Sequence, residues 1–110
     1  MINETLGKIE ARIASAESLS DTRKRELQEL LATLKTEVGD LSHTHREQAQ
    51  SIAGFAEVSA HEATRAEPNP QLLRLSLEGL SSSVHGFEQS HPELARVVNT
   101  ISQTLSNLGI

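Results

Sequence analysis

Cysteine, tryptophan and tyrosine are absent from this sequence, and its only phenylalanines are Phe55 and Phe87. The lack of cysteine excludes disulfides and thiol chemistry. With so few large side chains, the chain can form a narrow aliphatic core, but not the broad core around a deep pocket in which enzymes usually bury a substrate. The composition therefore favours a protein that is not an enzyme.

Long apolar runs and an excess of positive charge are missing as well. No stretch approaches the roughly 18 consecutive apolar residues of a membrane-spanning helix, and the N-terminus has no basic segment leading into an apolar run. We therefore expect a cytoplasmic protein without a membrane segment. The formal charge of −5 argues against a nucleic-acid binder, which needs a basic face. The basic run at residues 23–25 fits a solvated helix face paired with nearby acids.

Apolar residues instead recur in alternating steps of four and three, which is the pattern of helices that pack lengthwise on one another. This pattern predicts an all-α fold with a single domain over residues 1–110. The predicted helices cover residues 3–18, 20–66, 70–88 and 91–108. Because the second would be on the order of 65–70 Å long, we expect an elongated, coiled-coil-like bundle of about four helices around one long central helix.

The central stretch 20–66 contains one candidate break. Gly39, followed by Asp40, costs a helix interior about 1 kcal/mol relative to alanine and predicts a kink there. The apolar register continues across Gly39 without a slip, which favours a continuous helix, so both alternatives stay open. Further along the same stretch, His45 and Gln48 are polar, and in a homodimer we expect them to form a polar layer that fixes the register of the two copies.

Helix ends carry the residues that cap them. Ser20 and Asn69 stand at the expected starts of the second and third helices. The segment Ser90–Glu93 is typical of a capping box for the last helix. Gly86 and Gly109 suit the left-handed position that follows a helix, which predicts a Schellman ending at the C-terminus.

Charge is distributed unevenly, with 19 charged side chains in residues 1–66 but only 6 in residues 67–110. Depletion of charge around an apolar centre is typical of subunit contacts. We therefore expect the C-terminal helices to meet another chain, most simply a second copy in a homodimer; the alternative is a solvated surface rich in serine and threonine. The candidate interface residues are Ile52, Phe55, Leu73, Leu77, Leu80, Val84, Phe87, Val98, Ile101, Leu105 and Leu108.

The five histidines are candidate metal ligands: His43, His45, His61, His85 and His91. On a helix, His43 and His45 would point some 200° apart. The chain has no two Glu-x-x-His units of the di-iron type, no Gly-x-Ser-x-Gly elbow and no glycine-rich phosphate loop. We predict no catalytic residue, metal or cofactor. The alternative is a metal- or ligand-binding helical bundle that uses surface histidines.

The segment 87–95, with the sequence FEQSHPELA, and the ending 107–110 resemble the signature of a family of small bacterial proteins catalogued as a domain of unknown function. The front of the chain is similar to that family too, with a short helix, a Leu19-Ser20 turn and a charged, leucine-rich helix. The resemblance covers residues 1–38 and 84–110. It implies an all-helical bacterial protein and brings no activity or site residues. We therefore expect a non-enzymatic structural or adaptor protein that acts through protein contacts.

Overall fold

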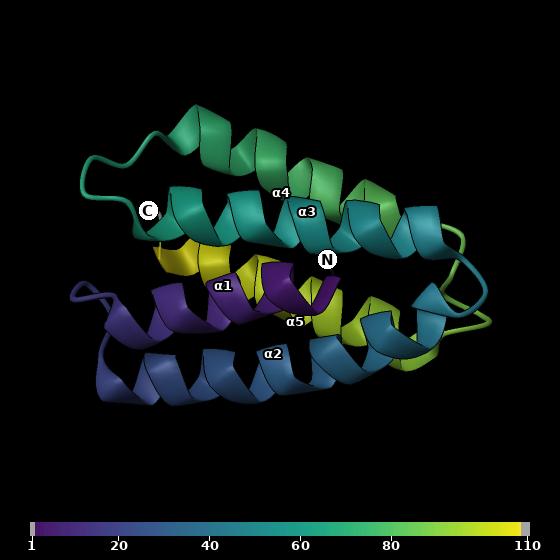
Figure 1. Cartoon of the computed structure of the whole chain (residues 1–110). Coiled ribbons are helices and arrows are strands. Elements are labelled where there is room, and N and C mark those ends of the chain that lie inside the picture. The colour runs from purple at the N-terminus through teal and green to yellow at the C-terminus, as the bar shows by residue number, and fades with distance from the viewer. Residues whose placement is uncertain (1, 109–110) are drawn as a thin grey trace.

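Apolar residues recurring every three to four positions fold into α-helices throughout the computed structural model, which describes residues 2–108. Within that range there are five helices and no strand: α1 (Ile2–Ser15), α2 (Asp21–Ser42), α3 (Arg46–Thr64), α4 (Pro70–Val84) and α5 (Pro92–Leu108). The all-α prediction is confirmed, although the bundle has one helix more than expected. In Figure 1, α3 lies between α4 and α1, with α2 below and α5 behind.

Helix α3 is the central element, since it packs against each of the other four helices, whereas α1 and α4 do not touch. The described chain measures 37 × 24 × 22 Å, and its radius of gyration is 12.8 Å. That radius is close to the ~13 Å of a compact domain of this length. The predicted elongated bundle is therefore wrong, because no helix approaches the expected length of the central one.

The predicted helix over residues 20–66 is two helices, α2 and α3, joined by a turn at residues 43–45. Gly39, the candidate kink, lies inside α2. The turn begins where polar side chains bond to the last helical carbonyls: the Ser42 hydroxyl donates to Gly39 O at 2.6 Å, and the Thr44 hydroxyl donates to Leu41 O at 3.4 Å. Such local bonds compete with continuation of a helix.

His45 and Gln48 lie beside this turn and are exposed, so they take no part in the core of the single chain. The polar layer expected of them between two copies stays a prediction. The side of α3 that faces the core is instead built mainly from small residues: Ala49, Ile52, Ala53, Ala56, Ser59, Ala60, Glu62 and Ala63. Small side chains allow neighbouring helices to approach closely, and α3 can therefore serve as the shared centre of the bundle.

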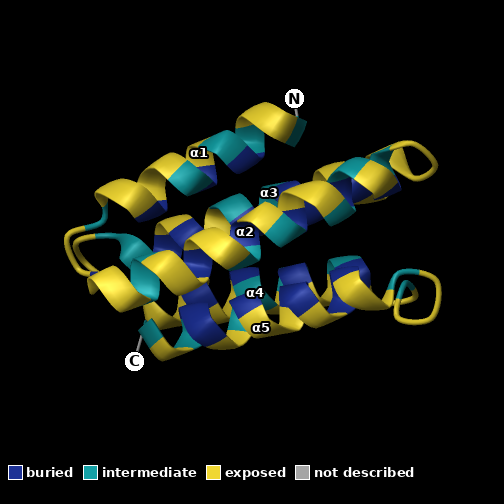
Figure 2. Cartoon of the chain, turned by 90° about the horizontal axis from the view of Figure 1, so that it is seen from below, coloured by how far each residue is buried: buried dark blue, intermediate teal, exposed yellow. Residues whose placement is uncertain are grey.

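The core is aliphatic and lies along the inward faces of all five described helices, as the dark blue faces in Figure 2 show. In the N-terminal half, residues spaced by three and four are buried: Leu6, Ile9 and Ile13 of α1, and Leu27, Leu31, Leu34, Val38 and Leu41 of α2. Within residues 2–108, no helix is both long enough and apolar enough to span a membrane.

Two of the predicted helix starts are confirmed by their hydrogen bonds. The Ser20 side chain accepts from Arg23 N at 3.2 Å, and the Asn69 side chain accepts from Leu72 N at 3.1 Å. Gly86 has φ +98°. Because that left-handed residue cannot continue a helix, α4 ends at Val84 rather than at residue 88.

The start of α5 differs from the predicted capping box. Ser90 Oγ lies 2.9 Å from His91 Nδ1, and the Glu93 carboxylate accepts two hydrogen bonds from Arg96. Glu93 is thus engaged with the residue three positions ahead instead of with the cap behind it. The predicted ending at Gly109 lies outside the described residues.

Candidate interaction surface on helices α3 and α4

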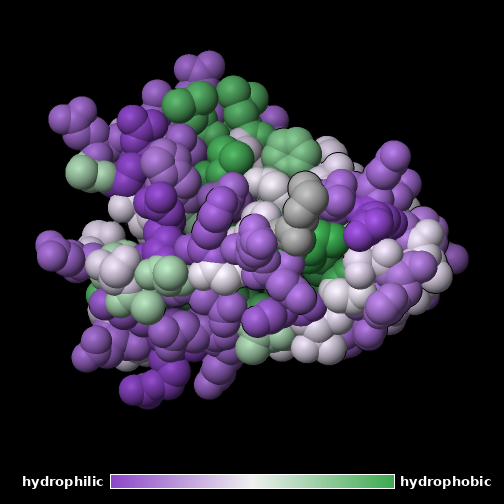
Figure 3. Space-filling view, in the orientation of Figure 1, coloured by the Kyte–Doolittle hydropathy of each residue, from purple (hydrophilic) through white to green (hydrophobic). Residues whose placement is uncertain are grey.

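Four large apolar side chains are exposed among the described residues, and all four lie on the adjacent helices α3 and α4. They are Phe55 (40% exposed), Val58 (47%), Leu72 (43%) and Leu75 (51%). We call them together the α3–α4 surface. Figure 3 shows green side chains gathered on one face of the molecule, over the region where Figure 1 places these helices. Single exposed apolar residues are ordinary, so the distinguishing feature here is that all four lie on two adjacent helices.

The α3–α4 surface rests on a close contact between its two helices. A Cβ built at Gly79 would overlap three atoms of the Phe55 ring, so the ring fills the space that a larger residue would occupy. One turn along each helix, Ser59 and Ser76 are also buried at 0% and 5% exposure. Small residues on both helices therefore bring α3 and α4 together and leave the larger apolar side chains outside.

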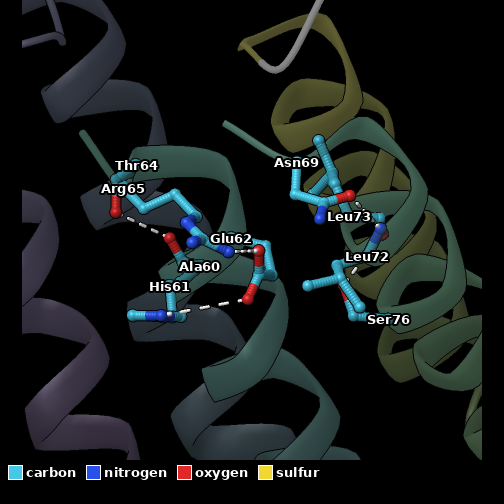
Figure 4. A network of polar contacts seen from close by, with 9 residues as sticks. All are labelled: Ala60, His61, Glu62, Thr64, Arg65, Asn69, Leu72, Leu73 and Ser76. Atoms are coloured by element: carbon cyan, nitrogen blue, oxygen red, sulfur yellow. Dashed lines mark hydrogen bonds and ion pairs between the residues drawn. The ribbon is translucent and has the colours of Figure 1, made fainter. Parts of the chain in front are cut away.

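Polar contacts within α3 and within α4 lie where the end of α3 comes beside the start of α4 (Figure 4). Glu62 is 7% exposed, and its carboxylate accepts from Arg65 at 2.8 Å. His61 Nε2 lies 3.8 Å from the same carboxylate. On α4, the hydroxyl of Ser76 donates to Leu73 O of the same helix at 2.8 Å. The buried carboxylate is thus paired, as a buried charge must be to avoid a large desolvation cost.

Two buried hydroxyls, Ser59 Oγ and Ser102 Oγ, have no hydrogen-bond partner. Ser59 belongs to the close α3–α4 contact, where a small residue is needed. Ser102 lies on α5 and lines an open groove between α4 and α5. Leucines and serines form most of that groove, whose lining residues include Leu73, Leu77 and Ser106.

A charge pair with shifted pKa values lies elsewhere, at the exposed start of α5. Arg96 donates to Glu93 at 2.6 and 3.0 Å. These side-chain hydrogen bonds lower the pKa of Glu93 and raise the pKa of Arg96, since they favour the charged form of each group. The pair stabilises the first turn of α5 and does not touch the α3–α4 surface.

The histidines are spread over the chain. His45 and His91 lie on either side of Phe87, with ring centroids 5.3 and 5.7 Å from the phenylalanine ring. They thereby join the α2–α3 turn to the loop before α5. His43 and His85 are exposed, and His61 belongs to the network described above. Over residues 2–108, no group of three or more histidine, aspartate or glutamate side chains is placed to hold a metal ion.

Most candidate interface residues are covered by their own chain. Seven are buried: Ile52, Leu73, Leu80, Val84, Val98, Ile101 and Leu105. Leu77, Phe87 and Leu108 are half-buried against the core. Among the eleven candidates only Phe55 is exposed, at 40%. The apolar rows read from the sequence are intramolecular seams.

The candidate interface residues did not include the other three members of the α3–α4 surface. Leu72 and Leu75 begin a second row with alternating steps of three and four, which runs beside the buried row of α4 through Gly79. The sequence predicts only that the mostly small residues of this second row let a neighbouring backbone come close. Val58 lies off the predicted rows, where the pattern calls for a polar side chain.

Comparison with protein families gives one match: the model of a domain of unknown function, DUF4404, matches residues 24–110. The match includes α3 and α4, and with them the whole α3–α4 surface. No curated protein matches this chain. No solved structure matches it. Since the family model covers well over half of the sequence, the chain belongs to the DUF4404 family.

Proposed function

We propose that this chain is a non-enzymatic protein of structural or adaptor type, whose function is carried by protein–protein contacts at the α3–α4 surface. The observation that supports this proposal is the gathering of Phe55, Val58, Leu72 and Leu75 on two adjacent helices. An apolar surface next to polar surroundings is the arrangement by which proteins recognise one another.

The local charge also supports a protein partner. Helix α3 has four charged side chains in 19 residues, and α4 has two in 15. Only two of the six are basic, Arg46 and Arg74. A nucleic acid needs several basic contacts to displace its counterions, and an anionic lipid surface favours lysine and arginine around the apolar face.

The proposal is tested by photo-crosslinking in the cells that make the protein. A photoreactive amino acid is placed at Val58, at the centre of the surface, and in a matched control at Ala32, which is exposed on α2. We expect a covalent adduct with protein from position 58 and none from position 32. Absence of any protein adduct from position 58, or equal adducts from both positions, would contradict the proposal.

A further inference from the structure

We infer that the partner of the α3–α4 surface is a second copy of the same chain, joined through a two-fold axis that passes near Val58 and Leu75. This inference rests on the proposed function and adds the identity of the partner. It follows from the order of side chains along the surface, from its size and from its charge.

The order of the side chains makes the surface self-complementary. Helices α3 and α4 are consecutive and run in opposite directions (Figure 1). Phe55 faces Gly79 near one end of the surface, and Leu72 lies beside the Glu62 network at the other end (Figure 4). Val58 and Leu75 fall between these ends. A two-fold axis that lies in the interface and runs across the line from Phe55 to Leu72 would place Phe55 of one copy against Leu72 of the other, twice.

The size of the surface suits a reversible dimer. At 1.5 Å per residue α3 and α4 are roughly 28 and 22 Å long, and packed helices lie about 8–10 Å apart. The two helices thus offer a face of about 500 Å² per copy, or about 1,000 Å² for a pair, which falls in the class of weak, transient interfaces. The four exposed side chains supply roughly 300 Å² of apolar area to each face. We therefore expect dissociation in the micromolar range.

Charge disfavours α1 and α2 as faces for a second copy. Each chain carries a formal charge of −5, so two copies repel one another in general. Helices α1 and α2 have 4 charged side chains in 14 residues and 9 in 22, against 4 in 19 and 2 in 15 for α3 and α4. One of the latter, Glu62, is already buried and paired with Arg65. Helix α5 is also poor in charge, with 2 charged side chains in 17 residues, but none of the four exposed large apolar side chains lies on it. The α3–α4 surface therefore combines low charge with exposed apolar area.

The test is sedimentation equilibrium of the full chain over concentrations from about 1 to 500 µM, a range that brackets weak interfaces. We expect the apparent mass to rise from 12.0 kDa toward twice that value. Leu75→Glu should hold the mass at the monomer value throughout the range. Ala32→Glu adds the same charge to α2 and should follow the unmodified chain. A chain that stays at the monomer mass, or a Leu75→Glu variant that dimerises like the unmodified chain, overturns the inference.

A second variant keeps the test decisive if Leu75→Glu loses its helical circular dichroism. The chain has no cysteine, so Val58→Cys introduces one thiol beside the proposed axis. Under mild oxidation it should form a disulfide-linked dimer at least ten times faster than Ala32→Cys, and equal rates overturn the inference. The two proposals fail separately. If the chain is monomeric but position 58 still crosslinks to a different protein, the inference of a second copy is wrong and the proposed function still holds.

Discussion

The ring of Phe55 on α3 occupies the space that a side chain at Gly79 on α4 would need. Phe55 is nevertheless 40% exposed, so the glycine supports one face of the ring while the other remains available. A single contact thus does two things. It closes the seam between α3 and α4, and it presents an aromatic side chain on the surface.

Substitution Gly79→Ala should remove this support. The new methyl group overlaps the Phe55 ring, which must swing away and lose its contact with α4. Alanine gains about 1 kcal/mol over glycine in a helix interior, while overpacking typically costs about 1–3 kcal/mol. We expect the free energy of unfolding, measured with urea and circular dichroism, to be unchanged or lower by up to about 2 kcal/mol.

The matched control is Gly54→Ala on α3, where an added Cβ would meet nothing within 4 Å. That variant should be more stable than the unmodified chain by about 0.5–1 kcal/mol. In a Phe55→Ala background the overlap disappears, so Gly79→Ala should then stabilise the chain like Gly54→Ala. If Gly79→Ala stabilises equally with and without the phenylalanine, the two residues are not coupled.

The buried carboxylate of Glu62 should depend on Arg65. The two groups are 2.8 Å apart, and the Glu62 side chain is 9% exposed while that of Arg65 is 34% exposed. Arg65→Ala leaves the carboxylate without its main partner, and we expect a loss of about 1–2 kcal/mol in the free energy of unfolding after allowing for solvent around the arginine. Urea denaturation of the variant at neutral pH measures this loss in the free energy of unfolding.

The control pair is Glu93 and Arg96, which has the same spacing along a helix but is exposed on both sides. Arg96→Ala should lower stability much less than Arg65→Ala, because exposed ion pairs contribute little. Equal losses in the two variants would mean that burial of Glu62 adds nothing to its pair.

The exposed pair should still be visible in a titration. Hydrogen bonds from Arg96 hold the pKa of Glu93 below its ordinary value of 4.5, since they favour the ionised carboxylate. The stabilisation is therefore complete above the pKa of Glu93 in the unfolded chain and is lost as the pH falls through the lower pKa of the folded chain. Carbon-detected NMR of the Glu93 carboxyl should give a midpoint below 4.5, and Arg96→Ala should raise it. A midpoint that Arg96→Ala leaves unchanged would disprove this cause.

The sequence predicts the helical content and most core positions, since both follow from local spacing. Leu34 and Val38 are fully buried where the periodicity places them. The same rule failed at residues 43–45, because an alternating row of four and three steps reports the face of a helix but not where the helix stops. Hydroxyls at Ser42 and Thr44 bond to nearby carbonyls at this turn, but Ser76 makes the same bond inside α4, so such residues do not mark a helix end in the sequence.

The α3–α4 surface was out of reach for a related reason. Periodicity identifies rows that must be covered, and it cannot tell whether the cover comes from the same chain or from another. Once the central helix folds back on itself, α3 covers the rows of the other helices, and Leu80 and Ile101 become core residues. What remains for a partner is the set of apolar residues outside those rows, of which Val58 is the clearest example.

Ile52 and Phe55 show the consequence most directly, because they are two candidate interface residues three positions apart on α3. Ile52 is 0% exposed and Phe55 is 40% exposed. Ile52→Ala leaves a cavity in a closed core and should lower the free energy of unfolding by about 2–4 kcal/mol. Phe55→Ala removes a half-open side chain and should cost about 1 kcal/mol.

Self-association should rank these two variants in the opposite order. Urea unfolding at a concentration well below that needed for dimerisation isolates the stability of the single chain, since binding would otherwise add to it. Sedimentation at high concentration then measures the contact between copies, which Phe55→Ala should weaken at least tenfold and Ile52→Ala should leave intact as long as the chain is folded. Equal stability losses in the two variants would mean that the two side chains are equally buried, which would contradict the difference in exposure between them.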